Sequence, residues 1–126
     1  MAEKMPQREM AVHEMQALAG GDTMTIYISG KITGTTDYLN RFKEAEQHLR
    51  KAGHEVINPA ELNLQFGTNR PWEFYMRNCI RWLIGCKAIY MLKGWQNSKG
   101  ATFEHEVAIN TGITVIEQEE DLDEWG

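Results

Sequence analysis

The residues best suited to chemistry lie in the segment 94–104, Gly-Trp-Gln-Asn-Ser-Lys-Gly-Ala-Thr-Phe-Glu. It follows an apolar run, 88–92, that is typical of a buried strand, and a helix is expected over 101–111. A helix N-terminus after a glycine-containing turn attracts anions. Glu104, about one turn into this helix, could point back at whatever the turn holds. This pattern suits an enzyme that holds a charged substrate and attacks it, although the helix dipole alone also favours an acidic residue in a first turn.

A second polar turn follows the first expected strand, 24–29. It reads Gly30-Lys31-Ile32-Thr33-Gly34-Thr35-Thr36 and has the composition of a loop that tolerates phosphate. It lacks the spacing and the Gly-Lys-Ser/Thr ending of a P-loop. A plain turn is the alternative for this loop.

Length and composition exclude several classes of protein. The 126 residues suffice for one domain, and the net charge of −5 gives no general basic surface for nucleic acid. No apolar run approaches the roughly 20 residues of a membrane span, and the N-terminus lacks a signal-peptide core, so we expect a cytoplasmic protein. Cys79 and Cys86 stand too far apart on one helix for a disulfide, and no Cys/His spacing suits zinc. We therefore expect no metal and no cofactor.

Expected strands alternate with expected helices along the chain. The strands are 24–29, 54–58, 87–92 and 113–116, and the helices are 37–52, 71–85 and 101–111. This alternation predicts an α/β fold: a Rossmann- or flavodoxin-like three-layer sandwich with a four- to five-stranded parallel sheet. A fifth strand could come from the N-terminal arm or the tail, or be missing.

The chain divides into an arm (1–22), a domain (23–117) and an acidic tail (118–126). The arm is expected to hold a short helix over 9–18 or to be loose. Asn58 lies at the carboxyl end of the second strand, where such sheets contact substrates. Trp72, Phe74 and Tyr75 follow the next loop and could stack on a base, pack in the core or form an interface.

Three segments carry a resemblance to a known family. They are Ile26-Tyr27-Ile28-Ser29-Gly30 with Gly34, then Gly53-His54-Glu55-Val56-Ile57-Asn58-Pro59, and then 94–104 with Ala108 and Gly112. Over roughly 24–116 the chain resembles the nucleoside 2-deoxyribosyltransferase superfamily. It looks closest to small phage and bacterial members of unassigned function, and more distantly like 2′-deoxynucleoside 5′-phosphate N-hydrolase.

The resemblance implies a mechanism and a set of site residues. Glu104 would be a nucleophile that attacks the anomeric carbon and forms a covalent glycosyl–enzyme, which water or a second nucleobase resolves. Tyr27 would lie beside it, and Ser98 would contact a 5′-phosphate. The further residues expected to bind substrate or phosphate are Ser29, Gly30, Lys31, Gly34, Asn58 and Gly100. The resemblance also implies a homo-oligomer whose partner is a small nucleoside or nucleotide.

The sequence departs from the family at its expected acids. Lys87 stands where an aspartate is usual before the third strand, and Asn78, Cys79 and Arg81 occupy the neighbourhood of a second acid. Protonation of the leaving base would then need another acid, such as Glu61 or Glu106. Three hypotheses stay open: an N-glycosidase or deoxyribosyltransferase, a nucleotide sensor or sponge, and an oligomeric scaffold with a vestigial pocket. Lys31, Lys93 and Lys99 favour a phosphorylated ligand.

Overall fold

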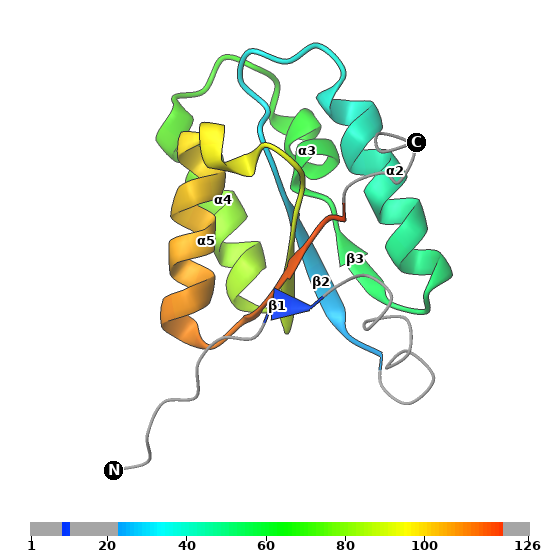
Figure 1. The fold of residues 1–126 in the computed structure, drawn as a ribbon. Coiled ribbons are helices and arrows are strands. Elements are labelled where there is room, and N and C mark those ends of the chain that lie inside the picture. The colour runs from blue at the N-terminus through cyan, green and yellow to red at the C-terminus, as the bar shows by residue number, and fades with distance from the viewer. Residues whose placement is uncertain (1–8, 11–22, 120–126) are drawn as a thin grey trace.

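The computed structural model describes residues 9–10 and 23–119, which form a three-layer α/β sandwich (Figure 1). Its sheet has five strands in the order β1-β5-β4-β2-β3, and every pair is parallel. The strands are β1 (Glu9–Met10), β2 (Thr25–Ser29), β3 (Glu55–Ile57), β4 (Ala88–Met91) and β5 (Thr114–Glu117). The predicted fold class is confirmed.

Helices cover both faces of the sheet. They are α2 (Tyr38–Lys51), α3 (Pro59–Leu62), α4 (Trp72–Ile84) and α5 (Lys99–Thr111), with the 3₁₀ turns η1 (Asn63–Phe66) and η2 (Trp95–Asn97). α2 packs Phe42, Ala45 and Leu49 on one face, whereas α4 and α5 lie together over the other (Figure 1). None of the described helices is long and apolar enough to span a membrane.

The N-terminal arm supplies the fifth strand. Glu9 pairs with Val115, and Met10 pairs with Ile116, at the edge of the sheet. The helix expected over 9–18 is therefore wrong at its first two residues, and the rest of that range lies outside the described part of the chain. Two residues carry too little periodicity to predict a strand.

The loop after β3 is more ordered than expected, because it forms α3 and η1. The Asn58 side chain accepts a hydrogen bond from the Glu61 N–H at 3.3 Å, and Pro59 occupies the first turn of α3. An Asn cap followed by Pro is a common helix start.

α5 begins two residues earlier than expected. The Ser98 hydroxyl oxygen accepts a hydrogen bond from the Ala101 N–H at 3.1 Å and caps the helix. Glu104 is consequently the sixth helical residue and lies beyond the first turn. The explanation of Glu104 by the helix dipole alone loses most of its force, because that effect fades past the first turn.

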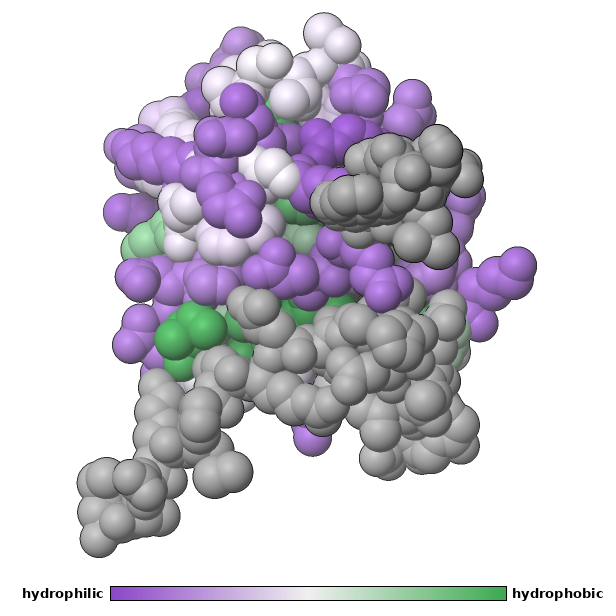
Figure 2. All heavy atoms as spheres, viewed as in Figure 1, coloured by the Kyte–Doolittle hydropathy of each residue, from purple (hydrophilic) through white to green (hydrophobic). Residues whose placement is uncertain are grey.

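Most of the described surface seen in Figure 2 is hydrophilic. The buried apolar side chains form two clusters, one on each side of the sheet. Alternate residues of β2 divide between these clusters, with Ile26 and Ile28 toward α2 and Tyr27 toward α4 and α5. The same alternation turns Ser29 to the side of Tyr27, where it meets α5.

Candidate active site

A buried carboxylate lies between the sheet and α5. Glu104 is only 5% exposed, and both of its oxygens accept hydrogen bonds from β2. The Tyr27 hydroxyl donates to Oε2 at 2.6 Å, and the Ser29 hydroxyl donates to Oε1 at 2.6 Å. Because side chains two apart on a strand share a face, the short segment 27–29 suffices to hold both oxygens.

Burial and hydrogen bonding act on Glu104 in opposite directions. Burial raises the pKa of Glu104 to about 7, and hydrogen bonds from Ser29, Tyr27 and Cys79 limit that rise. At neutral pH the carboxyl group is therefore present in both forms. The pKa of Tyr27 is raised well above its usual value, mainly by burial and then by the charge of Glu104, so its hydroxyl remains a donor.

Cys79 of α4 borders the same carboxylate. Burial, and then the negative charge of Glu104, raise the pKa of Cys79 to about 12, so the group is a neutral thiol. The Asn63 amide donates to its sulfur at 3.5 Å, and the Asn78 amide donates to Asn63 Oδ1 at 3.2 Å. The sequence placed Asn78 and Cys79 in the neighbourhood of an expected acid, but it did not predict their contacts with Asn63, which lies in a different segment.

A cleft of about 750 Å³ opens from this buried group along the carboxyl ends of the strands. Of the residues predicted to bind substrate, Gly30, Lys31, Ser98 and Gly100 line it. Glu104 is not itself among the lining residues; it is buried behind Ala101, about one helical turn away, and Cys79, which both line the cleft at what we call its inner end. The remaining walls come from the start of α2, from α3 and η1, and from the first half of α4; they include Tyr38, Pro59, Asn63, Thr68, Trp72, Glu73, Tyr75 and Met76.

One end of the cleft is suited to an anion. The capped N-terminus of α5 opens into it at Ser98, Lys99 and Gly100, and Lys31 approaches from the loop after β2. The Lys99 ammonium lies 4.3 Å from the centre of the Trp72 ring, which places a positive charge on the cleft wall. The third predicted lysine, Lys93, is not among the lining residues.

Residues 24–117 match the protein family described as "Domain of unknown function (DUF4406)". The chain belongs to this family. A comparison with curated proteins gave no significant match.

The fold of this DUF4406 protein is shared by a solved enzyme. The structure of the 2-deoxyribosyltransferase from the psychrotolerant bacterium Bacillus psychrosaccharolyticus superposes with a TM-score of 0.61. The two sequences are 19% identical, and the match covers 80% of this chain and 89% of the enzyme. At this identity the likeness establishes a common fold.

Five predicted site residues of the DUF4406 protein are not among the residues that line the cleft. Glu104, Tyr27 and Ser29 are buried together behind the lining, whereas Gly34 and Asn58 lie elsewhere. Gly34 is exposed in a turn at φ +83°. The Asn58 amide is committed to the fold: besides capping α3, it donates to Glu46 Oε1 at 3.0 Å. The side chain of Asn58 thus has a structural role that its place after a strand did not reveal.

Lys87, which stands where the resembled deoxyribosyltransferases were expected to have an aspartate, does not line the cleft. Lys87 is exposed at the amino end of β4, where its N–H bonds to Thr25 O at 2.9 Å. The cleft lies at the opposite, carboxyl end of the same strands. A lysine at this position therefore removes no group from the site.

The carboxylates expected to supply a proton are also elsewhere. Glu61 pairs with Lys43 at 3.3 Å, and Glu106 is exposed on α5; neither lines the cleft. Glu73, in the first turn of α4, does line it. Sequence reasoning missed Glu73, although an acidic residue just after Pro71 and Trp72 is a common helix-start feature.

The aromatic residues after the loop divide into two groups. Phe74 and Tyr75 pack edge to face, and the Tyr75 hydroxyl donates to Gly67 O at 2.5 Å. These contacts fasten the loop that forms one cleft wall. Trp72 instead stays 40% exposed, with its ring facing Lys99.

Among residues 9–10 and 23–119, no group of three His, Cys, Asp or Glu side chains is arranged to hold a metal ion.

Proposed function

We propose that this protein cleaves the N-glycosidic bond of a nucleoside or nucleotide, with Glu104 as the nucleophile. The observation that carries the proposal is the pair of 2.6 Å hydrogen bonds that hold both Glu104 oxygens directly behind the inner end of the cleft. A buried carboxyl group with a raised pKa beside a cleft is typical of catalytic sites. The named activity of the fold neighbour, 2-deoxyribosyl transfer, supports the same chemistry.

The reaction runs in two displacements. One oxygen of ionised Glu104 attacks the anomeric carbon, the carbon–nitrogen bond breaks, and its electron pair leaves with the base. Water or a second nucleobase then attacks the same carbon and frees the carboxylate. Tyr27 and Ser29 orient the nucleophile, and Tyr27 stays protonated throughout because of its raised pKa.

We propose a 5′-monophosphate as the preferred substrate. Ser98, the free N–H groups at the start of α5, Lys31 and Lys99 together form the part of the cleft that favours an anion. The sugar would then lie between this end and Glu104. The predicted roles of Gly30 and Gly100 follow from their place in the same lining, where they let the backbone approach the ligand.

The test is a chromatographic assay for free base with a panel of nucleosides and 5′-monophosphates, ribo and deoxy. We expect base release by the wild type and none by Glu104→Ala. Glu106→Ala is the matched control, because Glu106 lies on the same helix and is exposed away from the cleft. Persistent release by Glu104→Ala would remove Glu104 from the mechanism.

A second candidate is a nucleotide sensor or sponge on the same cleft. It is favoured by the burial of Glu104, which leaves the group 5% exposed and keeps much of it neutral at pH 7. This function predicts ligand binding by calorimetry with no base released over hours. Base release that is lost in Glu104→Ala would rule it out.

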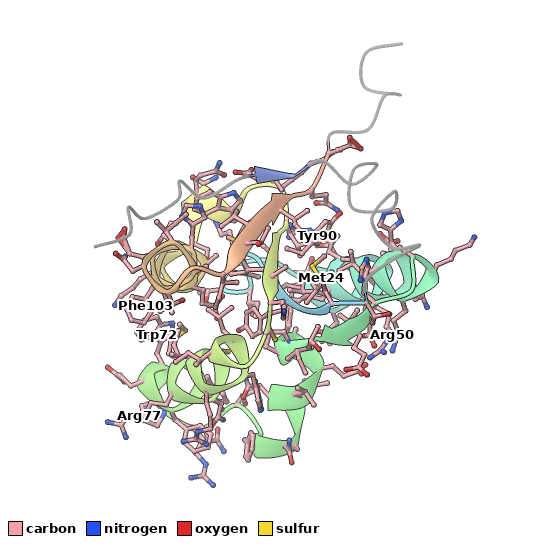
Figure 3. The ribbon with its side chains drawn as sticks, turned by 90° about the horizontal axis from the view of Figure 1, so that it is seen from below. Met24, Arg50, Trp72, Arg77, Tyr90 and Phe103 are labelled. Atoms are coloured by element: carbon pink, nitrogen blue, oxygen red, sulfur yellow. The ribbon has the colours of Figure 1, made fainter. Side chains whose placement is uncertain are left out.

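We also propose that the protein self-associates through an apolar face on α4 and α5, formed by Trp72, Ile80, Ile84 and Phe103. Ile84 is 60% exposed and Phe103 is 50% exposed, and Trp72 and Phe103 lie side by side (Figure 3). Trp72 lines both this face and the cleft, so a second copy here would extend the cleft wall. Light scattering should give a dimer or larger assembly that Ile84→Ser with Phe103→Ser dissociates; a monomeric wild type would contradict this.

A further inference from the structure

Cleavage of the N-glycosidic bond requires a proton donor as well as a nucleophile. The departing base carries away the electron pair of the broken bond and becomes a poor leaving group unless it gains a proton. In the second displacement, water must lose a proton as it attacks. The group that serves both steps has to face the cleft, and this requirement rests on the function proposed above.

The titratable side chains among the described lining residues are few: Lys31, Tyr38, Glu73, Tyr75, Cys79 and Lys99. Tyr75 already donates its hydroxyl hydrogen to Gly67 O at 2.5 Å. The Cys79 thiol, with its pKa raised to about 12, exchanges protons poorly near neutral pH. Glu73 is the one carboxyl group in this lining set.

Glu73 is also placed on the correct wall. Glu73, Met76 and Cys79 recur every three residues along α4, and all three line the cleft. Cys79 borders Glu104 at the inner end, so Glu73 lies about 9 Å further along the helix axis, toward the mouth. Met76 fills the space between and packs against α5, within 3.3 Å of where a Gly100 Cβ would lie.

This separation fits an N-glycoside. The proton that assists a departing nucleobase enters a ring nitrogen or an exocyclic oxygen, which lies beyond the glycosidic nitrogen itself. The acid must therefore stand further from the nucleophile than in an O-glycosidase that retains configuration, where the two carboxyl groups are about 5 Å apart. The mouth of the cleft is where the base would lie, because the base has to leave first.

We propose that Glu73 is the general acid and general base of this site. In the first step, protonated Glu73 gives its proton to the base as Glu104 bonds to the anomeric carbon and the carbon–nitrogen bond breaks. In the second step, the Glu73 carboxylate takes a proton from water as the water oxygen bonds to that carbon and Glu104 departs. One proton enters Glu73 and one leaves it in each cycle, so the group is restored.

The experiment compares Glu73→Gln with two controls, Glu61→Gln and Glu106→Gln, which change exposed carboxylates outside the cleft lining. On an unmodified substrate, we expect Glu73→Gln to lower kcat about 10²- to 10⁴-fold and the controls to change it less than about 2-fold. On a purine nucleotide methylated at N7, the base leaves as a neutral molecule and needs no proton. Base release in the first turnover should then stay within about 10-fold of the wild type.

A second measurement does not depend on the base. With Glu73→Ala, added azide should restore turnover and yield a glycosyl azide, because this anion attacks the anomeric carbon without losing a proton. Wild-type kcat in Glu73→Gln, with Glu104→Ala inactive, would overturn the role of Glu73 while leaving the proposed function intact. No base release by the wild type would overturn both, and an unchanged melting temperature of Glu73→Gln would show that the substitution has not disturbed the fold.

Discussion

At the scale of single residues, two opposed effects determine the pKa of Glu104: burial raises it, and hydrogen bonds from hydroxyl donors lower it. Ser29→Ala removes the donor to Oε1 at 2.6 Å. A hydrogen bond to a charged group contributes about 1.5–3 kcal/mol, so we expect the pKa of Glu104 to rise by about 1–2 units from about 7. The acidic limb of kcat/KM should move to higher pH by the same amount, and a ¹³C titration of the carboxyl group should report the shift directly.

Ser98→Ala is the matched control for that shift. It also deletes a cleft hydroxyl, but this hydroxyl caps α5, whereas the hydroxyl donors to Glu104 are Tyr27 and Ser29. We expect its acidic limb to coincide with that of the wild type. A Ser29→Ala limb that does not move would show that burial alone determines the pKa of Glu104.

At the scale of secondary-structure elements, Ser98 at the N-terminus of α5 has two roles: it caps the helix, and it is proposed to bind the phosphate. Ser98→Ala leaves the Ala101 N–H without its partner at 3.1 Å and should lower the unfolding free energy by about 1 kcal/mol. It should also raise KM for a 5′-monophosphate more than KM for the corresponding nucleoside. Ser98→Thr keeps the hydroxyl and should change both quantities less; equal effects on the two substrates would contradict a phosphate role.

The close approach of the chain after β2 to the chain after β4 leaves no room for a side chain at Gly30. A Cβ at Gly30 would lie 2.8 Å from Leu92 Cδ1 and 3.0 Å from Leu92 Cβ, while the Leu92 N–H donates to Ser29 O at 2.8 Å. Gly30→Ala must therefore displace the cleft edge, and we expect a loss of about 1–3 kcal/mol in unfolding free energy. Chemical denaturation should show a far smaller loss for Gly85→Ala, whose Cβ would meet nothing closer than 3.7 Å. An unfolding free energy of Gly30→Ala equal to that of the wild type would mean that the Leu92 side chain can move aside at little energetic cost.

At the scale of the whole molecule, the sequence predicted the fold well because apolar residues recur within each helix and strand at the spacing typical of that element. The apolar runs of β2 and β4 are local patterns, and the structure confirms both as buried strands. Phe42, Ala45 and Leu49 recur at three- and four-residue spacing and form the buried side of α2. The cap at Ser98 was less visible, since its effect on the start of α5 depends on one side-chain oxygen. β1 was an open alternative because two residues set no period.

The site was predictable only in part, for a related physical reason. Ser98 and Lys31 stand in recognisable turns, and Glu104 stands in the helix expected after one of them. The contact of Asn63 with Cys79, in contrast, joins segments whose sequences do not indicate that they meet. The burial that raises the pKa of Glu104 is likewise a product of the complete fold. Glu73 and Asn58 were misjudged from their positions in the sequence. Glu73, in the first turn of a helix, lines the cleft, whereas Asn58, at the end of a strand, caps α3 instead.

Stability as a function of pH should carry the signature of Glu104. Its pKa in the folded state, about 7, exceeds that of an unfolded chain, so the folded state binds the proton more tightly between about pH 4.5 and 7. The contribution of Glu104 to stability is therefore complete at low pH and is lost as the pH rises through 7, by up to about 3 kcal/mol. Glu104→Gln has no charge to bury. The unfolding free energy of this variant, relative to that of the wild type, should therefore increase from pH 5 to pH 8 and stay constant above pH 8. Urea denaturation at four pH values measures this difference in unfolding free energy. The control variant, Glu106→Gln, should show the same pH dependence as the wild type. A difference between Glu104→Gln and the wild type that does not change with pH would mean that ionising Glu104 costs little in the folded protein.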